Sequence, residues 1–117
     1  MLPRAGQESK MFEMKPQNLF CVPPSPTGGE VVHTLLEEGV LRVERILSNG
    51  CSSPEGFWYD QEQSEWVVLI QGTAVLRFED NRTVELVAGD YVVIQRHTKH
   101  RVEEVSDDAL WLAVHHG

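Results

Sequence analysis

The feature that most constrains the fold of this chain is a series of short apolar runs, each of which ends at a turn signal. The runs are rich in Val, Ile, Leu and Thr, and they recur at the spacing of roughly eight to twelve residues that is typical of all-β domains. No segment of about ten or more residues has the apolar periodicity of an amphipathic helix. The sequence therefore predicts an all-β fold, either a sandwich or a barrel.

The expected strands are separated by residues that favour tight turns. Gly72 and the pair Asp80-Asn81 each supply one, because glycine, asparagine and aspartate tolerate positive φ angles. The run 65–71 is apolar on both faces and predicts a strand buried on both sides, with Trp66 in the core. The predicted strands cover residues 30–36, 40–47, 65–71, 73–79, 84–87, 91–94, 100–105 and 109–115.

The chain length of 117 residues accommodates one domain with one hydrophobic core. Residues 1–17 are polar and lack periodicity, and we expect them to form a flexible N-terminal tail. The domain is expected to cover residues 18–117. Within it, the prolines and glycines of residues 23–29 predict a loop, since proline cannot donate a ladder hydrogen bond.

The charge balance excludes two classes of partner. With 10 basic and 18 acidic residues the formal net charge is −8, whereas nucleic acids and anionic membranes attract basic surfaces. No apolar run approaches the roughly 20 residues needed to cross a bilayer, and the N-terminus lacks the apolar core of a secretory signal. We therefore expect a cytoplasmic protein.

The two cysteines, Cys21 and Cys51, do not form a Cys-x-x-Cys pair. Two cysteines are also fewer than a disulfide scaffold carries, so reduced thiols in or near the core are expected. Cys51 lies in a turn-like stretch and is the more reactive candidate.

One basic residue lies on an otherwise apolar strand face. Leu41, Val43 and Leu47 share a face with Arg45 in the expected strand 40–47. We interpret Arg45 as a residue at the barrel end that reaches water, because buried arginine is rare. The alternative is a polar group inside a pocket.

Two segments carry spacings that point to a particular family. Glu65 is separated from Gly72 by six residues, and Gly89 precedes His100 by ten intervening residues. These segments resemble the paired motifs of the cupin superfamily, Gly-x5-His-x-His-x4-Glu-x6-Gly and Gly-x5-Pro-x-Gly-x2-His-x3-Asn. The resemblance covers residues 40–115 and is to small single-domain bacterial cupins. It implies a jelly-roll-like antiparallel β-barrel of the cupin type.

The first motif is divergent. Its two histidines fall on Trp58 and Asp60 or, with one residue fewer before Glu65, on Tyr59 and Gln61. In the second motif the proline, the glycine and the terminal asparagine are replaced, in that order, by Gln95, His97 and Glu104. Gly72, Gly89 and the strand alternation, which carry the fold, are retained.

The resemblance implies a site inside the barrel. In cupins the side chains of the first motif project into the barrel, where the histidine of the second motif joins them. By that analogy Asp60, Glu65 and His100 converge as two carboxylates and one imidazole, with His97 as a fourth ligand or an acid–base group. Mixed oxygen and nitrogen ligands of this kind suit a divalent metal such as Mn²⁺, Fe²⁺ or Zn²⁺.

The pocket around this site is expected to include Trp58, Tyr59 and Gln61. Adjacent strand residues point to opposite faces, so one of the two aromatic side chains faces the pocket in either register. At the end of the last strand, His115 and His116 are interpreted as a frayed strand terminus.

Each candidate ligand also has a purely structural interpretation. Glu65 could form a buried ion pair with an arginine, His100 could be a hydrogen-bonded interior histidine, and Asp60 could be a turn residue.

Three functions therefore stay open. They are a metal-dependent enzyme acting on a small molecule, a metal-free module that binds a small ligand, and a barrel filled by side chains that serves only in assembly. Residues 18–47 are expected to help form a homodimer, because exposed edge strands need to be covered.

Overall fold

The computed structural model describes residues 14–23 and 28–117 and confirms the all-β prediction. Every predicted strand is present, with boundaries within two residues of those expected. None of the described residues builds a helix that could span a membrane. The eight strands are β1 (Val31–Glu38), β2 (Leu41–Leu47), β3 (Ser64–Gln71), β4 (Thr73–Phe78), β5 (Thr83–Val87), β6 (Tyr91–Ile94), β7 (His100–Val105) and β8 (Leu110–His116).

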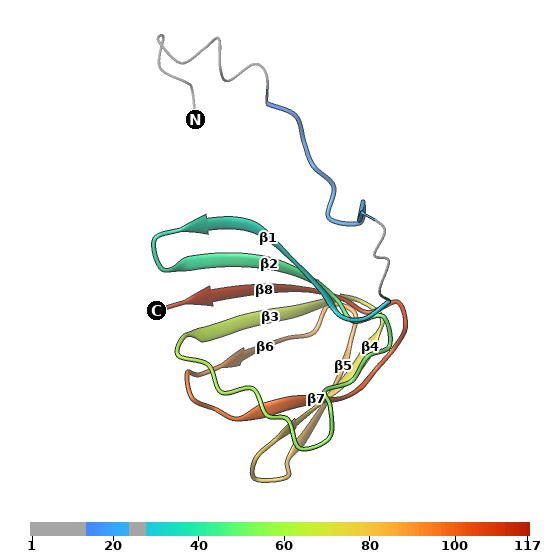
Figure 1. Ribbon diagram of the computed structural model, residues 1–117, viewed down its shortest axis with the longest axis vertical. Helices are drawn as coiled ribbons and strands as arrows, with labels where there is room; N and C mark the ends of the chain where they lie inside the picture. Colours follow the sequence, from blue (N-terminus) through green and yellow to red (C-terminus); the bar gives the residue numbers. More distant parts are fainter. Residues whose placement is uncertain (1–13, 24–27) are drawn as a thin grey trace.

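The strands form two antiparallel sheets that enclose the core (Figure 1). A five-stranded sheet has the order β1-β2-β8-β3-β6, and a three-stranded sheet has the order β5-β4-β7. β8 lies between β2 and β3, so the last strand pairs with two strands that precede it far back in the chain. The barrel is thus made of two separate sheets, and the described strands do not close into one hydrogen-bonded cylinder.

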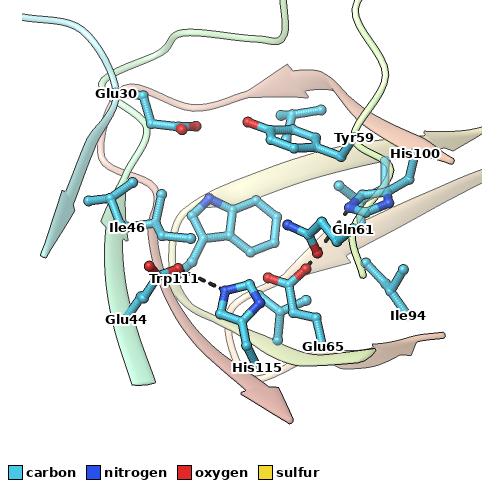
Figure 2. Close-up of a pocket in the computed structure, with 14 residues that line it drawn as sticks. Glu30, Glu44, Ile46, Tyr59, Gln61, Glu65, Ile94, His100, Trp111 and His115 are labelled. Carbon is cyan, nitrogen blue, oxygen red and sulfur yellow. Dashed lines mark hydrogen bonds and ion pairs between the residues drawn. The ribbon is translucent and has the colours of Figure 1, made fainter. Parts of the chain in front are cut away.

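The two faces of β2 have different surroundings. Glu44 and Ile46 point into the space between the sheets (Figure 2), so Arg45 points outward. Arg45 is nevertheless only 7% exposed, because the N-terminal segment covers it. Its guanidinium donates hydrogen bonds to the carbonyl oxygens of Leu19 (3.1 Å) and Cys21 (3.4 Å). Both interpretations of Arg45, a residue at the barrel end reaching water and a pocket residue, are wrong.

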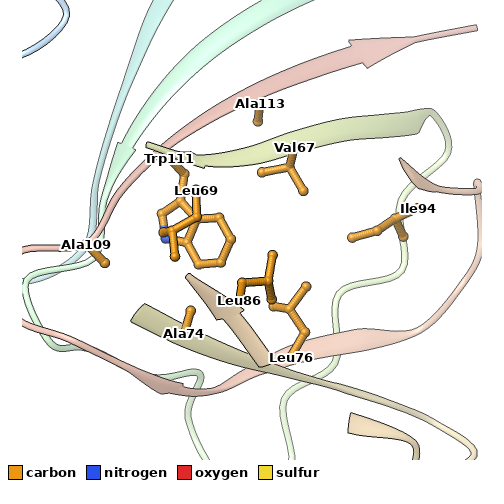
Figure 3. Packing of buried hydrophobic residues seen from close by; sticks show 9 residues of the cluster. All are labelled: Val67, Leu69, Ala74, Leu76, Leu86, Ile94, Ala109, Trp111 and Ala113. Atoms are coloured by element: carbon orange, nitrogen blue, oxygen red, sulfur yellow. The ribbon is translucent and has the colours of Figure 1, made fainter. Parts of the chain in front are cut away.

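Inward-facing side chains of both sheets form the hydrophobic core (Figure 3). Trp111 is the large aromatic residue of this core, and its indole N–H donates to Ser48 Oγ at 2.9 Å. Trp66 was expected there, but it is half-buried and packs against Tyr91 with ring centroids 5.3 Å apart. Since Glu65 and Val67 face inward, Trp66 faces the opposite side of β3. The buried cluster consists of Val67, Leu69, Ala74, Leu76, Leu86, Ile94, Ala109, Trp111 and Ala113.

Segments outside the strands fit the sequence expectations only in part. Residues 14–17 of the expected tail have no regular structure and are exposed, while residues 1–13 lie outside the described residues. Residues 24–27 of the expected loop also lie outside them. Both cysteines are free, as predicted, but Cys21 and Cys51 are exposed and do not belong to the core.

Gly72 forms the turn that connects β3 of one sheet to β4 of the other. Gly72 and Gly89 both have positive φ angles, +91° and +97°. A Cβ atom at Gly72 would lie 2.8 Å from Ala109 Cα and 2.9 Å from Asp108 Oδ1, whereas at Gly89 it would meet no atom within 4 Å.

We therefore expect Gly72→Ala to lower the free energy of unfolding by about 1–3 kcal/mol more than Gly89→Ala, since overpacking adds to the shared backbone strain. Urea unfolding of both variants measures the difference. Equal losses would show that the space around Gly72 adjusts without cost.

Candidate functional site

A cavity of about 130 Å³ lies between the two sheets. One part of its wall is apolar and continuous with the core, formed by Val32, Ile46, Val67, Leu76, Ile94, Val102 and Trp111. The other part is polar and consists of Glu30, Glu44, Tyr59, Gln61, Glu65, His100 and His115 (Figure 2). Buried polar groups normally have partners, so the interactions of these seven residues define what the cavity can do.

Strand pairing brings the polar residues together. Glu65 of β3 lies directly opposite His115 of β8 in the antiparallel register. His100 starts β7 in the other sheet and is held by the loop before β3: its backbone exchanges two hydrogen bonds with that of Tyr59, at 2.7 and 3.1 Å. The Tyr59 ring stacks on the His100 imidazole, with centroids 5.4 Å apart and planes 25° apart.

Glu65 and His100 face each other across the cavity. Their side chains are 8% and 7% exposed, and His100 Nε2 lies 4.0 Å from Glu65 Oε1. The other imidazole nitrogen, Nδ1, is 2.8 Å from the carbonyl oxygen of Thr98. A carbonyl can only accept, so Nδ1 carries the proton and the neutral ring presents a lone pair at Nε2.

Burial shifts the pKa values of both groups toward their neutral forms. It raises the pKa of Glu65 above the usual value of 4.5, with a further rise from the charge of Glu44 and an opposing effect of His115. It lowers the pKa of His100 below 6.5, although the hydrogen bond to Thr98 acts in the other direction. The pair is therefore an acid and a base held close together in a region of low polarity.

Glu44 and His115 form a second pair on the same wall, in which His115 is buried and Glu44 is partly buried. His115 Nε2 lies 2.8 Å from Glu44 Oε1, and Arg42 Nε lies 3.0 Å from Glu44 Oε2. His115 is 3% exposed, so its interpretation as a frayed strand end is wrong. A signal for it was present in the sequence: Trp111, Ala113 and His115 alternate along one strand and so share one face.

Glu30 and Tyr59 close the polar wall on the side of β1. The Glu30 carboxylate lies toward the Tyr59 hydroxyl (Figure 2). Burial, followed by the nearby charges of Glu30 and Glu65, raises the pKa of Tyr59 to about 12. Burial also raises the pKa of Glu30. Tyr59 thus stays protonated and can donate a hydrogen bond at neutral pH.

The structure does not gather the four residues that were expected to bind a metal. Asp60 and His97 pair with each other at the surface, where Nδ1 lies 2.9 Å from Oδ1 and the side chains are 43% and 62% exposed. Only Glu65 and His100 line the cavity. In residues 14–23 and 28–117, no three His, Cys, Asp or Glu side chains are arranged to hold a metal ion. The donors present therefore do not fit the expected metal site.

The three residues expected around the pocket are also divided. Tyr59 and Gln61 line the cavity. Trp58 does not, and the Arg101 guanidinium lies 6.0 Å from its ring centroid. The arginine ion pair considered for Glu65 is not formed in the described part of the chain, where His100 is the partner within ion-pair distance.

Comparisons with known proteins agree with this architecture. A crystal structure from Ralstonia eutropha JMP134, named as a proposed mannose-6-phosphate isomerase, is 39% identical, with a TM-score of 0.80 over 87% of this chain and 97% of that one. An RmlC-like cupin from Desulfovibrio desulfuricans is 17% identical, with a TM-score of 0.70 over 87% and 95%. Another from Methanocaldococcus jannaschii, with a double-stranded β-helix fold, is 19% identical, with a TM-score of 0.63 over 80% and 85%.

The family assignment rests on a match to most of the chain. None of the curated proteins matches this sequence. The family model of the cupin domain matches residues 42–115. This range covers β2 to β8 except for the first residue of β2 and the last residue of β8. Together with the paired motifs and the two facing sheets, this match shows that the chain belongs to the cupin superfamily.

Proposed function

We propose that this cupin binds a small molecule in the cavity between its sheets, through Glu65 and His100. One observation carries the proposal: a carboxyl group and an imidazole are both buried there without a hydrogen bond between them. The cavity of about 130 Å³ is smaller than the roughly 300–1,000 Å³ of sites for drug-sized ligands. The ligand is therefore small.

The energetic cost of this arrangement supports the proposal. Removing a carboxyl group from water costs free energy unless hydrogen bonds replace its hydration, and burial is the main cause of the raised pKa of Glu65. An apolar side chain at position 65 would extend the core formed by Val67 and Leu69 on the same strand face. A chain that keeps Glu65 there gives up stability, which is typical of a group retained for binding or catalysis.

A sugar isomerase is the second candidate. It is favoured by the 39% identical protein that is named as a proposed mannose-6-phosphate isomerase. Aldose–ketose interconversion needs a base that moves a proton between neighbouring carbon atoms, and Glu65 and His100 are proton-carrying groups that face one cavity. Phosphate is usually bound by Arg, Lys or backbone N–H groups, but neither Arg nor Lys occurs among the described lining residues. An unphosphorylated substrate fits better.

A ligand-observed NMR screen of small polar molecules tests the binding function. We expect binders whose signal is lost in the cavity-filling variant Val102→Phe and weakened about tenfold or more in Glu65→Gln, because a hydrogen bond to a charged group is worth about 1.5–3 kcal/mol. Asp60→Asn, a change at the surface, should bind like the wild type. Including mannose and mannose 6-phosphate in the screen tests the second candidate. Binding that persists in Val102→Phe would place the ligand elsewhere.

Glu65→Gln should also change how stability depends on pH. The folded-state pKa of Glu65 lies above 4.5, the ordinary value that applies to the unfolded chain. Between the unfolded-state pKa and the folded-state pKa, the folded protein therefore holds more protons than the unfolded one. Its stability therefore falls as the pH rises through that window, by up to about 1.4 kcal/mol per unit of pKa difference.

We expect the stability of Glu65→Gln relative to the wild type to increase as the pH rises from 4.5 through the raised pKa of Glu65, as measured by urea unfolding. The exposed variant Glu85→Gln controls for the loss of one negative charge. A difference between Glu65→Gln and wild type that stays constant with pH would contradict a raised pKa.

The expected homodimer stays a prediction. β1 is an edge strand with exposed Leu35 and Leu36 side chains, and Val40 in the following turn is also exposed. Unpaired strand edges with apolar side chains favour pairing with another chain. Sedimentation velocity should show a dimer that Leu36→Glu weakens. A monomer at high protein concentration would refute the dimer.

A further inference from the structure

We propose that the ligand of this cavity carries a protonated amine, which lies between the Glu65 carboxylate and His100 Nε2. This inference deepens the proposed function and rests on it. It names the chemical class of the ligand, a small organic ammonium compound. The argument uses the hydrogen-bonding capacity of the two facing groups, the charges of the cavity wall and the aromatic surfaces beside them.

The first step is that the two facing groups are both acceptors once Glu65 is ionised, which is the form that a bound cation favours. His100 Nδ1 donates its proton to the carbonyl oxygen of Thr98 at 2.8 Å, which leaves only a lone pair at Nε2 of the neutral ring. An ionised Glu65 has acceptors only. The 4.0 Å between Nε2 and Oε1 is too long for a hydrogen bond. The gap therefore calls for a group that donates in two directions at once.

Gln61 does not remove this need. Its Oε1 atom is buried and has no hydrogen-bond partner in the described structure, which adds a third acceptor beside the other two (Figure 2). Rotating the amide by half a turn exchanges its oxygen and nitrogen, and the nitrogen could then donate to one Glu65 oxygen. The second carboxylate oxygen and His100 Nε2 would still lack donors.

The second step is that the cavity wall is acidic. Three carboxyl groups line it, those of Glu30, Glu44 and Glu65, and no Lys or Arg does in the described structure. Glu44 is already compensated by Arg42 at 3.0 Å and His115 at 2.8 Å. Glu65 has no contact of comparable length. A cationic ligand would supply the missing compensation, whereas an anion would be repelled in a medium of low dielectric constant.

The third step concerns the aromatic surfaces. The indole N–H of Trp111 is bound to Ser48 Oγ at 2.9 Å, so Trp111 presents carbon atoms and its π-system to the cavity. The Tyr59 ring lies beside His100, with centroids 5.4 Å apart. Ammonium groups and the CH₂ groups next to them are attracted to such surfaces. An ammonium has three N–H donors for the acceptors, which a single hydroxyl group cannot match.

Three probes of nearly equal size and different charge test the inference. They are ethanolamine, a cation at pH 7.5, ethylene glycol, which is neutral, and glycolate, an anion. Each is titrated into EDTA-treated protein at constant ionic strength, and binding is followed through the amide signals of residues around the cavity in two-dimensional NMR spectra. Wild type, Glu65→Gln and the exposed control Glu85→Gln are compared.

We expect ethanolamine to bind about tenfold more tightly than ethylene glycol, because hydrogen bonds that involve charged groups are roughly twice as strong as neutral ones. Glycolate should not saturate the site. Glu65→Gln should remove most of the preference for ethanolamine, while Glu85→Gln should keep it.

Two results would overturn the inference and differ in what they leave standing. If ethylene glycol or glycolate binds as tightly as ethanolamine and shifts the same cavity signals, the ligand is not an amine, although the cavity still binds small molecules. If none of the three probes shifts these signals, the amine assignment is wrong. The Val102→Phe comparison in the wider screen then decides separately whether the cavity binds any ligand.

Discussion

The antiparallel register between β3 and β8 is the constraint on which the rest of this structure depends. It sets Leu69 opposite Trp111 at one end of the strand pair and Glu65 opposite His115 at the other. All four side chains lie on the inner face, so one strand pair supplies both the hydrophobic core and the polar wall of the cavity. A slip of one residue would turn the core residues and the polar residues of the shifted strand outward. The core therefore fixes the site, because the apolar pairs specify the register that the polar pairs need.

The second sheet completes the site across the core. β7 begins with His100 at the point where the loop before β3 passes, and backbone hydrogen bonds to Tyr59 hold the histidine there. The stacked Tyr59 ring and the Thr98 carbonyl then fix the imidazole plane and its tautomer. A base held in this way needs no rearrangement to meet a donor, and preorganisation of this kind strengthens both binding and catalysis.

Much of the fold was predictable from the chain, because alternation and turn residues act locally. The apolar runs and the turn at Gly72 predicted every strand, and the motif spacings selected Glu65 and His100, both of which line the cavity. The prediction failed where both faces of a strand are apolar. In β3, periodicity alone does not say which face is inside, so Trp66 was placed in a core that Trp111 occupies. The loops before β3 and before β7 have no periodicity, so Asp60 and His97, which lie in them, could not be located from sequence.

What the sequence determined by itself was the class of fold, the strand boundaries and two of the buried polar residues, since these follow from short-range patterns and fixed spacings. Only the tertiary structure decided which groups meet. His115 contacts Glu44 across 71 positions of the chain, and Arg45 is covered by carbonyl groups of the N-terminal segment. Such contacts depend on how sheets pair and cover one another, a long-range property that no local pattern encodes. The chemistry of the cavity therefore emerges only after the strands have assembled.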